Sequence, residues 1–125
     1  MTNTRPIRIF RVNTGSCGGC DAEIEAAVAA GQLVWAASPA QADVILLTGP
    51  NLPSARPAFD AVLAQTGDQV PLVAIGRCAI DGRPFGRGGL AERPEIDARL
   101  KLDGCPPAPE KIVEALRNVM RQAGR

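Results

Sequence analysis

The sequence predicts a single α/β domain in which a parallel sheet of about four strands carries helices on both faces. Strand-like apolar segments alternate with helix-like segments, two of the strand-like segments are apolar almost throughout, and the last helix-like segment carries a regular apolar stripe. Continuous apolar runs are typical of strands covered on both faces, as in parallel sheets. Because 125 residues fit one domain, residues 1–125 are predicted to fold as one unit.

The first half of the chain predicts a strand, a helix and two further strands. The strands are expected at residues 7–12, 33–36 and 43–48. A helix through residues 22–30 is expected between the first two, with Asp21 as its cap and Gly31 at its end. Gly49 and Pro50 are expected to stop the third strand.

The second half predicts a buried strand between two helices. The helices are expected at residues 55–64 and 109–122, and the strand at residues 71–75. No element is assigned to residues 77–104, which have weak periodicity. A segment of this length in a small domain is expected to be functional or docked on something rather than a surface loop. The order of elements resembles the flavodoxin class.

The composition excludes several kinds of function. The chain has no histidine, which excludes serine–histidine catalysis and histidine-bound metals. Its net charge of +1 gives no electrostatic reason to expect nucleic acid. No signal peptide or membrane-spanning segment is expected, because no apolar run is long enough. In a reducing cytosol, the four cysteines are read as metal ligands or redox groups before disulfides.

The four cysteines stand where predicted strands end or a helix begins. Cys17 and Cys20 follow the first strand in the run SCGGCDAEIE. Cys78 follows the fourth strand, and Cys105 precedes the last helix. In an open α/β sheet, ligands bind outside the carboxyl ends of the strands. We therefore expect the four thiols to line one pocket at that edge.

Ligand type and spacing restrict the metal that this pocket would hold. Thiolates suit zinc or an iron–sulfur cluster. Structural zinc sites usually combine two close pairs, whereas this chain has one close pair and two distant cysteines. The spacing favours a 4Fe-4S cluster. A zinc-stabilised scaffold module, unligated core cysteines, and thiol–disulfide exchange at Cys17 and Cys20 are the alternatives.

Four ordered motifs carry a resemblance to a known family. SCGGCDAEIE, ADVILLTGP, VAIGRCA and GCPPAPEKIVEAL resemble the small subunits shared by nickel–iron hydrogenases and the 20 kDa subunit of complex I. The resemblance is greatest to the short small subunits of membrane-associated, energy-converting hydrogenases. It implies one proximal 4Fe-4S cluster in a flavodoxin-like domain, with Cys17, Cys20, Cys78 and Cys105 as ligands. It also implies a large nickel–iron catalytic subunit and a ferredoxin-like subunit as partners, so the chain would not be catalytic alone.

Two departures from the family pattern bear on the function. The complex I branch has adjacent cysteines in its first motif, whereas Gly18 and Gly19 separate them here. This favours hydrogenase over the alternative, a quinone-reducing NADH dehydrogenase subunit. Periplasmic hydrogenase small subunits carry a further cluster-bearing domain, for which this chain has no residues. We expect an electron-transfer subunit in the cytoplasm, held peripherally on the inner face of the cell membrane through partner subunits.

Four further features each have two readings. Glu23 stands where the family places an acidic residue near the subunit interface, which implies proton transfer, although the helix dipole also explains it. Thr48 would serve strand-end chemistry or donate a hydrogen bond near a sulfur. Trp35 would be a core edge or an interface anchor. The remaining feature is a basic run that would be solvated or would contact an acidic partner surface: Arg77, Arg83 and Arg87.

Overall fold

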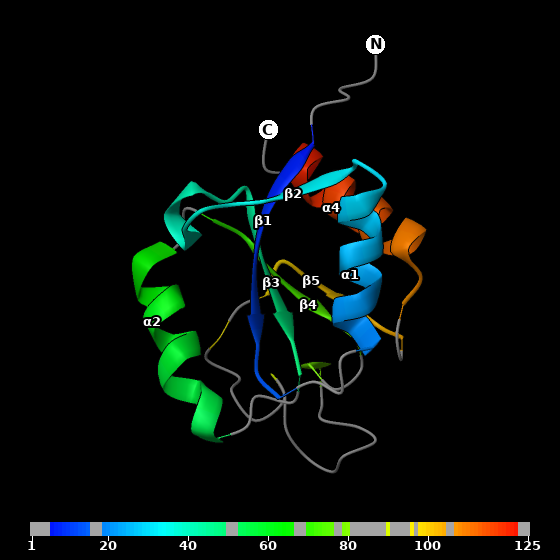
Figure 1. Cartoon of the computed structure of the whole chain (residues 1–125). Helices are drawn as coiled ribbons and strands as arrows, with labels where there is room; N and C mark the ends of the chain where they lie inside the picture. Colours follow the sequence, from blue (N-terminus) through cyan, green and yellow to red (C-terminus); the bar gives the residue numbers. More distant parts are fainter. Residues whose placement is uncertain are drawn as a thin grey trace.

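The chain folds around a five-stranded sheet (Figure 1). The computed structural model describes residues 6–15, 19–49, 53–66, 70–76, 79–80, 90, 96, 98–104 and 107–122. The strands are β1 (Ile7–Asn13), β2 (Leu33–Trp35), β3 (Val44–Thr48), β4 (Leu72–Ile75) and β5 (Leu100–Leu102). The helices are α1 (Gly19–Ala29), α2 (Arg56–Thr66) and α4 (Pro109–Gln122), with 3-10 turns at Pro39–Gln41 and Pro53–Ala55.

All neighbouring strands pair in parallel, in the order β2-β1-β3-β4-β5. This is the flavodoxin-like order, so the predicted fold class is confirmed. The order changes direction at β1, whose neighbours are β2 on one side and β3 on the other. Asn13 lies opposite Thr48 at the carboxyl ends of β1 and β3. The loops that follow the strands therefore leave from one edge of the sheet.

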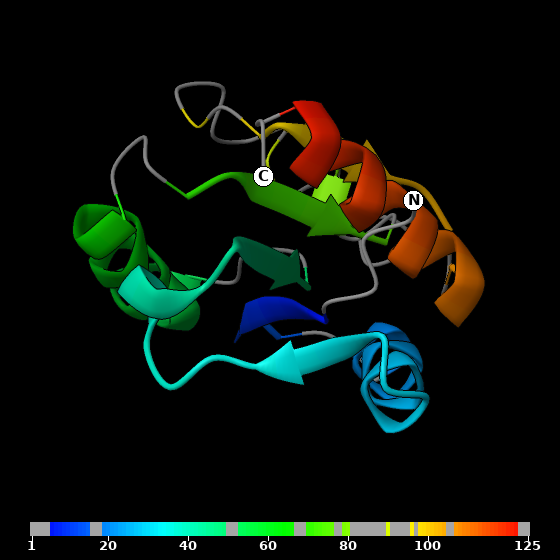
Figure 2. The same ribbon diagram turned by 90° about the horizontal axis from the view of Figure 1, so that it is seen from above.

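Alternating side chains of the strands build two apolar cores, one on each face of the sheet. Figure 2 shows α1 and α4 over one face and α2 over the other. Along β3, Val44 and Leu46 belong to the α1/α4 core, whereas Ile45 and Leu47 belong to the α2 core. This double cover explains why β3 is apolar along most of its length. No helix in the described part of the chain is both long and apolar enough to cross a membrane.

Helix α1 ends as predicted but begins earlier than predicted. Its C-terminal glycine, Gly31, has a φ of 85°. The N–H of Gly31 donates to the carbonyl of Val28, and the N–H of Gln32 donates to that of Ala27, which is the Schellman arrangement. The helix starts at Gly19, so the prediction that Asp21 caps it was wrong. Asp21 lies in the first turn, and its carboxylate binds side chains of the sheet instead.

Residues 77–104 contain the fifth strand, which the sequence did not predict. In β5, exposed Lys101 separates two leucines that are only partly buried, because the strand is an edge strand paired with β4 alone. Such a short edge strand has little apolar signal. Elsewhere in this segment, Ala79 and Leu90 are fully or almost fully buried in the α2 core. The described part of the segment is therefore docked on the domain itself, and residues 77–78, 81–89, 91–95 and 97 lie outside the described residues.

We predict that Gly31→Ala lowers the free energy of unfolding by about 1 kcal/mol. A side chain at φ 85° is strained by about 1–2 kcal/mol, offset in part by the lower entropy of the unfolded chain. No atom lies within 4 Å of the added Cβ, so the effect is conformational alone. Urea unfolding with an unchanged m-value measures it. Gly31→Asn should be milder, because asparagine tolerates this conformation; equal stability of Gly31→Ala and wild type would contradict the assignment.

Candidate functional site

Cys20 lies in the first turn of α1, at the carboxyl edge of the sheet. Its side chain is part of the α1/α4 core, together with Ile9, Ile24 and Ile75. Only 5% of the residue is exposed. The thiol is thus held by apolar neighbours and largely shielded from water. Burial of this kind suits either a structural cysteine or a ligand of a shielded metal centre.

Gly76, which follows β4, lies directly against the Cys20 sulfur. A Cβ atom at Gly76 would overlap Cys20 Sγ, and it would lie 3.5 Å from the carbonyl oxygen of Gly104. The N–H of Gly76 donates to the carbonyl of Leu102 in β5 at 2.8 Å. The start of α1 and the ends of β4 and β5 therefore meet at one point, and only a residue without a side chain fits at position 76.

Of the four predicted cysteine ligands, Cys20 lies within the residues that the structure describes. Cys17, Cys78 and Cys105 lie outside the described residues, as do the three arginines of the predicted basic run, Arg77, Arg83 and Arg87. Among the described residues, no group of three or more His, Cys, Asp or Glu side chains could hold a metal ion. The expected meeting of four thiols therefore stays a prediction. What the structure describes is the contact of Cys20 with Gly76 and the approach of Gly104 to the same position.

A polar network joins α1 to the carboxyl ends of β1 and β3. The carboxylate of Asp21, in a residue that is 7% exposed, accepts hydrogen bonds from Thr48 Oγ1 at 3.1 Å and Asn13 Nδ2 at 3.0 Å. Arg11 Nε lies 3.3 Å from the same carboxylate. The side-chain oxygen of Asn13 accepts the N–H of Gly15 at 2.9 Å. Because Asp21 is bonded to Cys20 in the chain, this network fixes the start of α1 beside the sulfur.

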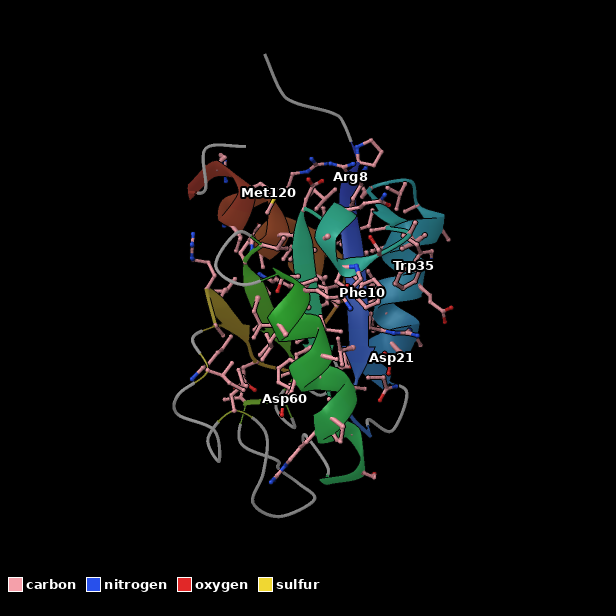
Figure 3. All side chains as sticks on the ribbon, turned by 90° about the vertical axis from the view of Figure 1, so that its left-hand side faces the viewer. Arg8, Phe10, Asp21, Trp35, Asp60 and Met120 are labelled. Atoms are coloured by element: carbon pink, nitrogen blue, oxygen red, sulfur yellow. The ribbon has the colours of Figure 1, made fainter. Side chains whose placement is uncertain are left out.

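Arg11 also faces the ring of Trp35 in the edge strand β2. Its guanidinium carbon lies 5.3 Å from the ring centroid, within the range of a cation–π interaction. Trp35 is 44% exposed, so it is an edge residue that covers Arg11 and also presents a face to solvent. Figure 3 shows Trp35 and Asp21 on the same side of β1. Both predicted readings of Trp35, core edge and interface anchor, are compatible with this position.

Sequence reasoning missed Arg11 and Asn13, although a signal for Arg11 exists. Arg11 shares its strand face with Ile7 and Ile9, which are buried in the α1/α4 core. A charged side chain at a position that continues a buried face needs a partner. The acid in the first turn of the next helix, Asp21, is the nearest candidate in the sequence.

The two other polar residues singled out in the sequence have different surroundings. Thr48 is fully buried and its hydroxyl donates to Asp21, which favours the strand-end reading. Its carbonyl accepts from both the N–H and the hydroxyl of Thr14, at 2.8 and 2.7 Å. Glu23 is partly buried in the first half of α1. A role for Glu23 in proton transfer stays a prediction.

Comparison with protein families gives a match over most of the chain. The model of the family described as NADH ubiquinone oxidoreductase, 20 kDa subunit, matches residues 17–119. This range includes the four cysteines, and it extends from the loop after β1 almost to the end of α4.

Individual relatives agree with the family match. An uncharacterized protein of Methanocaldococcus jannaschii is 34% identical over 95% of this chain and 86% of its own length. A probable membrane-bound hydrogenase subunit of Pyrococcus furiosus is 35% identical over 86% of this chain and 70% of its own length. Subunit K of the chloroplast NAD(P)H-quinone oxidoreductase of Populus trichocarpa is 31% identical over 74% of this chain, which spans 43% of that subunit.

A solved structure confirms the fold. A chain of the membrane-bound sulfane sulfur reductase, an archaeal respiratory membrane complex, superposes with a TM-score of 0.70. The match covers 94% of this chain and 70% of the other, at 19% sequence identity. At that identity the likeness concerns the arrangement of strands and helices.

We predict that Gly76→Ala lowers the free energy of unfolding by about 2–4 kcal/mol. The positive φ of 91° and the overlap with Cys20 Sγ both contribute, the overlap by about 1–3 kcal/mol. In a Cys20→Ala background the sulfur is absent, and the same substitution should cost about 1 kcal/mol, as at Gly31. Urea unfolding of the four proteins of this cycle measures the coupling. Equal costs in the two backgrounds would contradict the contact between Gly76 and Cys20.

Proposed function

We propose, because the chain belongs to the family of the 20 kDa subunit of NADH ubiquinone oxidoreductase, that it is an electron-transfer subunit. This is a family of oxidoreductase and electron-transport subunits. The chain would hold one 4Fe-4S cluster through Cys17, Cys20, Cys78 and Cys105. It would relay electrons between a ferredoxin-like subunit and the large catalytic subunit of a membrane-associated nickel–iron hydrogenase.

The contact of Cys20 with Gly76 and Gly104 is the observation that carries this proposal. Position 76 is a cradle that a Cβ would fill, and a soft sulfur atom lies against it. Cys105 directly follows Gly104, and Cys78 is two residues beyond Gly76. Since consecutive Cα atoms are about 3.8 Å apart, both cysteines belong to the segments that leave this contact. The donor chemistry and the bare backbone fit a thiolate-bound cluster.

The described residues would prepare the site for electron transfer in two ways. When bound, a 4Fe-4S cluster supplies a one-electron couple. Cys20 lies among apolar side chains of the α1/α4 core, which exclude water. The hydrogen bonds of Asp21 to Asn13 and Thr48 join the start of α1 to two strands. Both features restrain movement of the sulfur. Glu23, partly buried on the same helix, would assist proton movement at a subunit interface.

The hydrogenase reading is favoured over a quinone-reducing complex by two observations. The Pyrococcus furiosus relative, a probable membrane-bound hydrogenase subunit, is matched over 70% of its length, whereas the chloroplast subunit K is matched over 43%. In addition, Gly18 and Gly19 separate the first two cysteines, as in the hydrogenase branch that the sequence resembles. The chain would associate peripherally with the inner face of the membrane, through the membrane subunits of such a complex.

We predict that the chain purified without oxygen contains about four irons and is brown, with a paramagnetic signal on reduction. Cys105→Ser should abolish most iron binding, because a hard hydroxyl replaces a thiolate. Iron and sulfide analysis with electron paramagnetic resonance checks both outcomes. One zinc per colourless chain would favour the scaffold alternative. Disulfide exchange that survives Cys105→Ser in an iron-free chain would favour a thiol–disulfide function.

We also predict that the tagged chain, recovered from its own cells without oxygen, brings down a large subunit with two C-x2-C cysteine pairs. In the hydrogenase reading, the cysteines of these pairs would bind nickel and iron in the large subunit. Mass spectrometry of the co-purifying proteins and metal analysis of the complex check this outcome. A partner that lacks these pairs and catalyses quinone reduction would overturn the hydrogenase reading in favour of the complex I-like alternative.

A further inference from the structure

Two arginines of β1 each pair with an aspartate. One pair lies near the amino ends of the strands and the other near their carboxyl ends. Arg11 lies 3.3 Å from Asp21 at the carboxyl edge. Arg8 lies 3.4 Å from Asp43, just before β3, at the amino edge. Figure 3 shows Arg8 near the upper end of β1 and Asp21 near its lower end. Three residues of a strand span about 10 Å, and side chains at odd separation point to opposite faces.

The Arg11–Asp21 pair is the more enclosed of the two. The side chains of Arg11 and Asp21 are 31% and 10% exposed, against 58% and 23% for Arg8 and Asp43. Asp21 also accepts the hydrogen bonds of Asn13 and Thr48, so its position is set by three donors from two strands. The Trp35 ring covers Arg11 from the edge strand. Charges in such a place are less screened than at the surface.

Asp21 follows Cys20 in the chain, so this enclosed pair lies in or against the helical turn that carries a proposed ligand sulfur. Its opposite charges nearly cancel at a distance, but each acts on a group held at Cys20. The negative charge of Asp21 disfavours an added electron, and the positive charge of Arg11 favours it. The reduction potential of an iron–sulfur cluster depends on local charge and on hydrogen bonds around its sulfurs.

We propose that Arg11 and Asp21 are positioning residues that balance the charge beside Cys20 and so set the reduction potential of the group bound there. The inference rests on the proposed function, because it needs a redox group at Cys20. It assigns to these two residues control of the reduction potential, in addition to their structural role. A structural role alone would give both substitutions the same kind of effect, namely loss of stability or of bound iron.

The test is the midpoint potential of the anaerobically purified chain and its variants, followed by electron paramagnetic resonance. At the solution potential where half of the wild-type chains are reduced, more than half should be reduced in Asp21→Asn. Fewer than half should be reduced in Arg11→Met. The double variant should return toward the wild-type value, because it removes both charges. Shifts of opposite sign that cancel in this cycle support the proposal.

Matched controls separate charge from support. Asp43→Asn and Arg8→Met remove the equivalent charges at the far edge and should leave the potential unchanged. Arg11→Lys keeps the charge and should keep a potential near that of wild type. If Asp21→Asn loses its iron, the comparison of Arg11→Met with Arg11→Lys still decides, because only the former loses charge.

The outcomes also distinguish this inference from the proposed function. A wild-type chain without iron would overturn the proposed function and, with it, this inference. A wild-type chain with the cluster but equal potentials in wild type, Asp21→Asn and Arg11→Met would overturn the inference alone. Shifts of the same sign in both variants, or equal shifts in Arg8→Met and Arg11→Met, would also overturn it.

Discussion

The contact between the start of α1 and the ends of the strands depends on parallel pairing across the sheet. In a parallel sheet every strand delivers its carboxyl end to the same edge. Two backbone hydrogen bonds extend the pairing past the strands: Thr14 donates to Thr48, and Gly76 donates to Leu102. They bring the residues after β1 to those after β3, and the residues after β4 to those after β5. With an antiparallel neighbour, Gly76 and Gly104 would leave from opposite edges.

The buried carboxylate of Asp21 converts this common edge into a defined position for Cys20. Burying a carboxylate is unfavourable unless hydrogen bonds and an opposite charge replace its water. Here Asn13 and Thr48 supply the hydrogen bonds and Arg11 supplies the charge. The three donors come from neighbouring strands in fixed register, so the acid can be satisfied in one place only. The helix that carries Cys20 is therefore anchored to the sheet.

Sequence patterns predicted the elements whose residues are uniformly apolar or periodic, and failed where tertiary contacts decide. Strand β3 is buried on both faces, and its continuous apolar run predicts it from the sequence. Strand β5 pairs on one side and has exposed Lys101 at its centre, so its pattern is too weak to read. The start of α1 was misplaced for a related reason. Aspartate is a common N-cap residue, but the carboxylate of Asp21 binds side chains of β1 and β3 instead of capping the helix.

Prediction of the site followed the same division. Topology alone predicts that the cysteine-bearing loops share an edge, and this stays a prediction for Cys17, Cys78 and Cys105, which lie outside the described residues. Within the described residues, Cys20 contacts Gly76. Topology does not distinguish Gly31 from Gly76, because both glycines follow a helix or strand and both have a positive φ. The difference lies in packing: the space beside Gly31 is open, whereas a sulfur atom fills that beside Gly76. At Gly76, the space that a side chain would need is occupied by the thiol of Cys20, which comes from a distant part of the sequence. The three-dimensional structure is therefore needed to distinguish a glycine that makes room for a sulfur from one that only ends a helix.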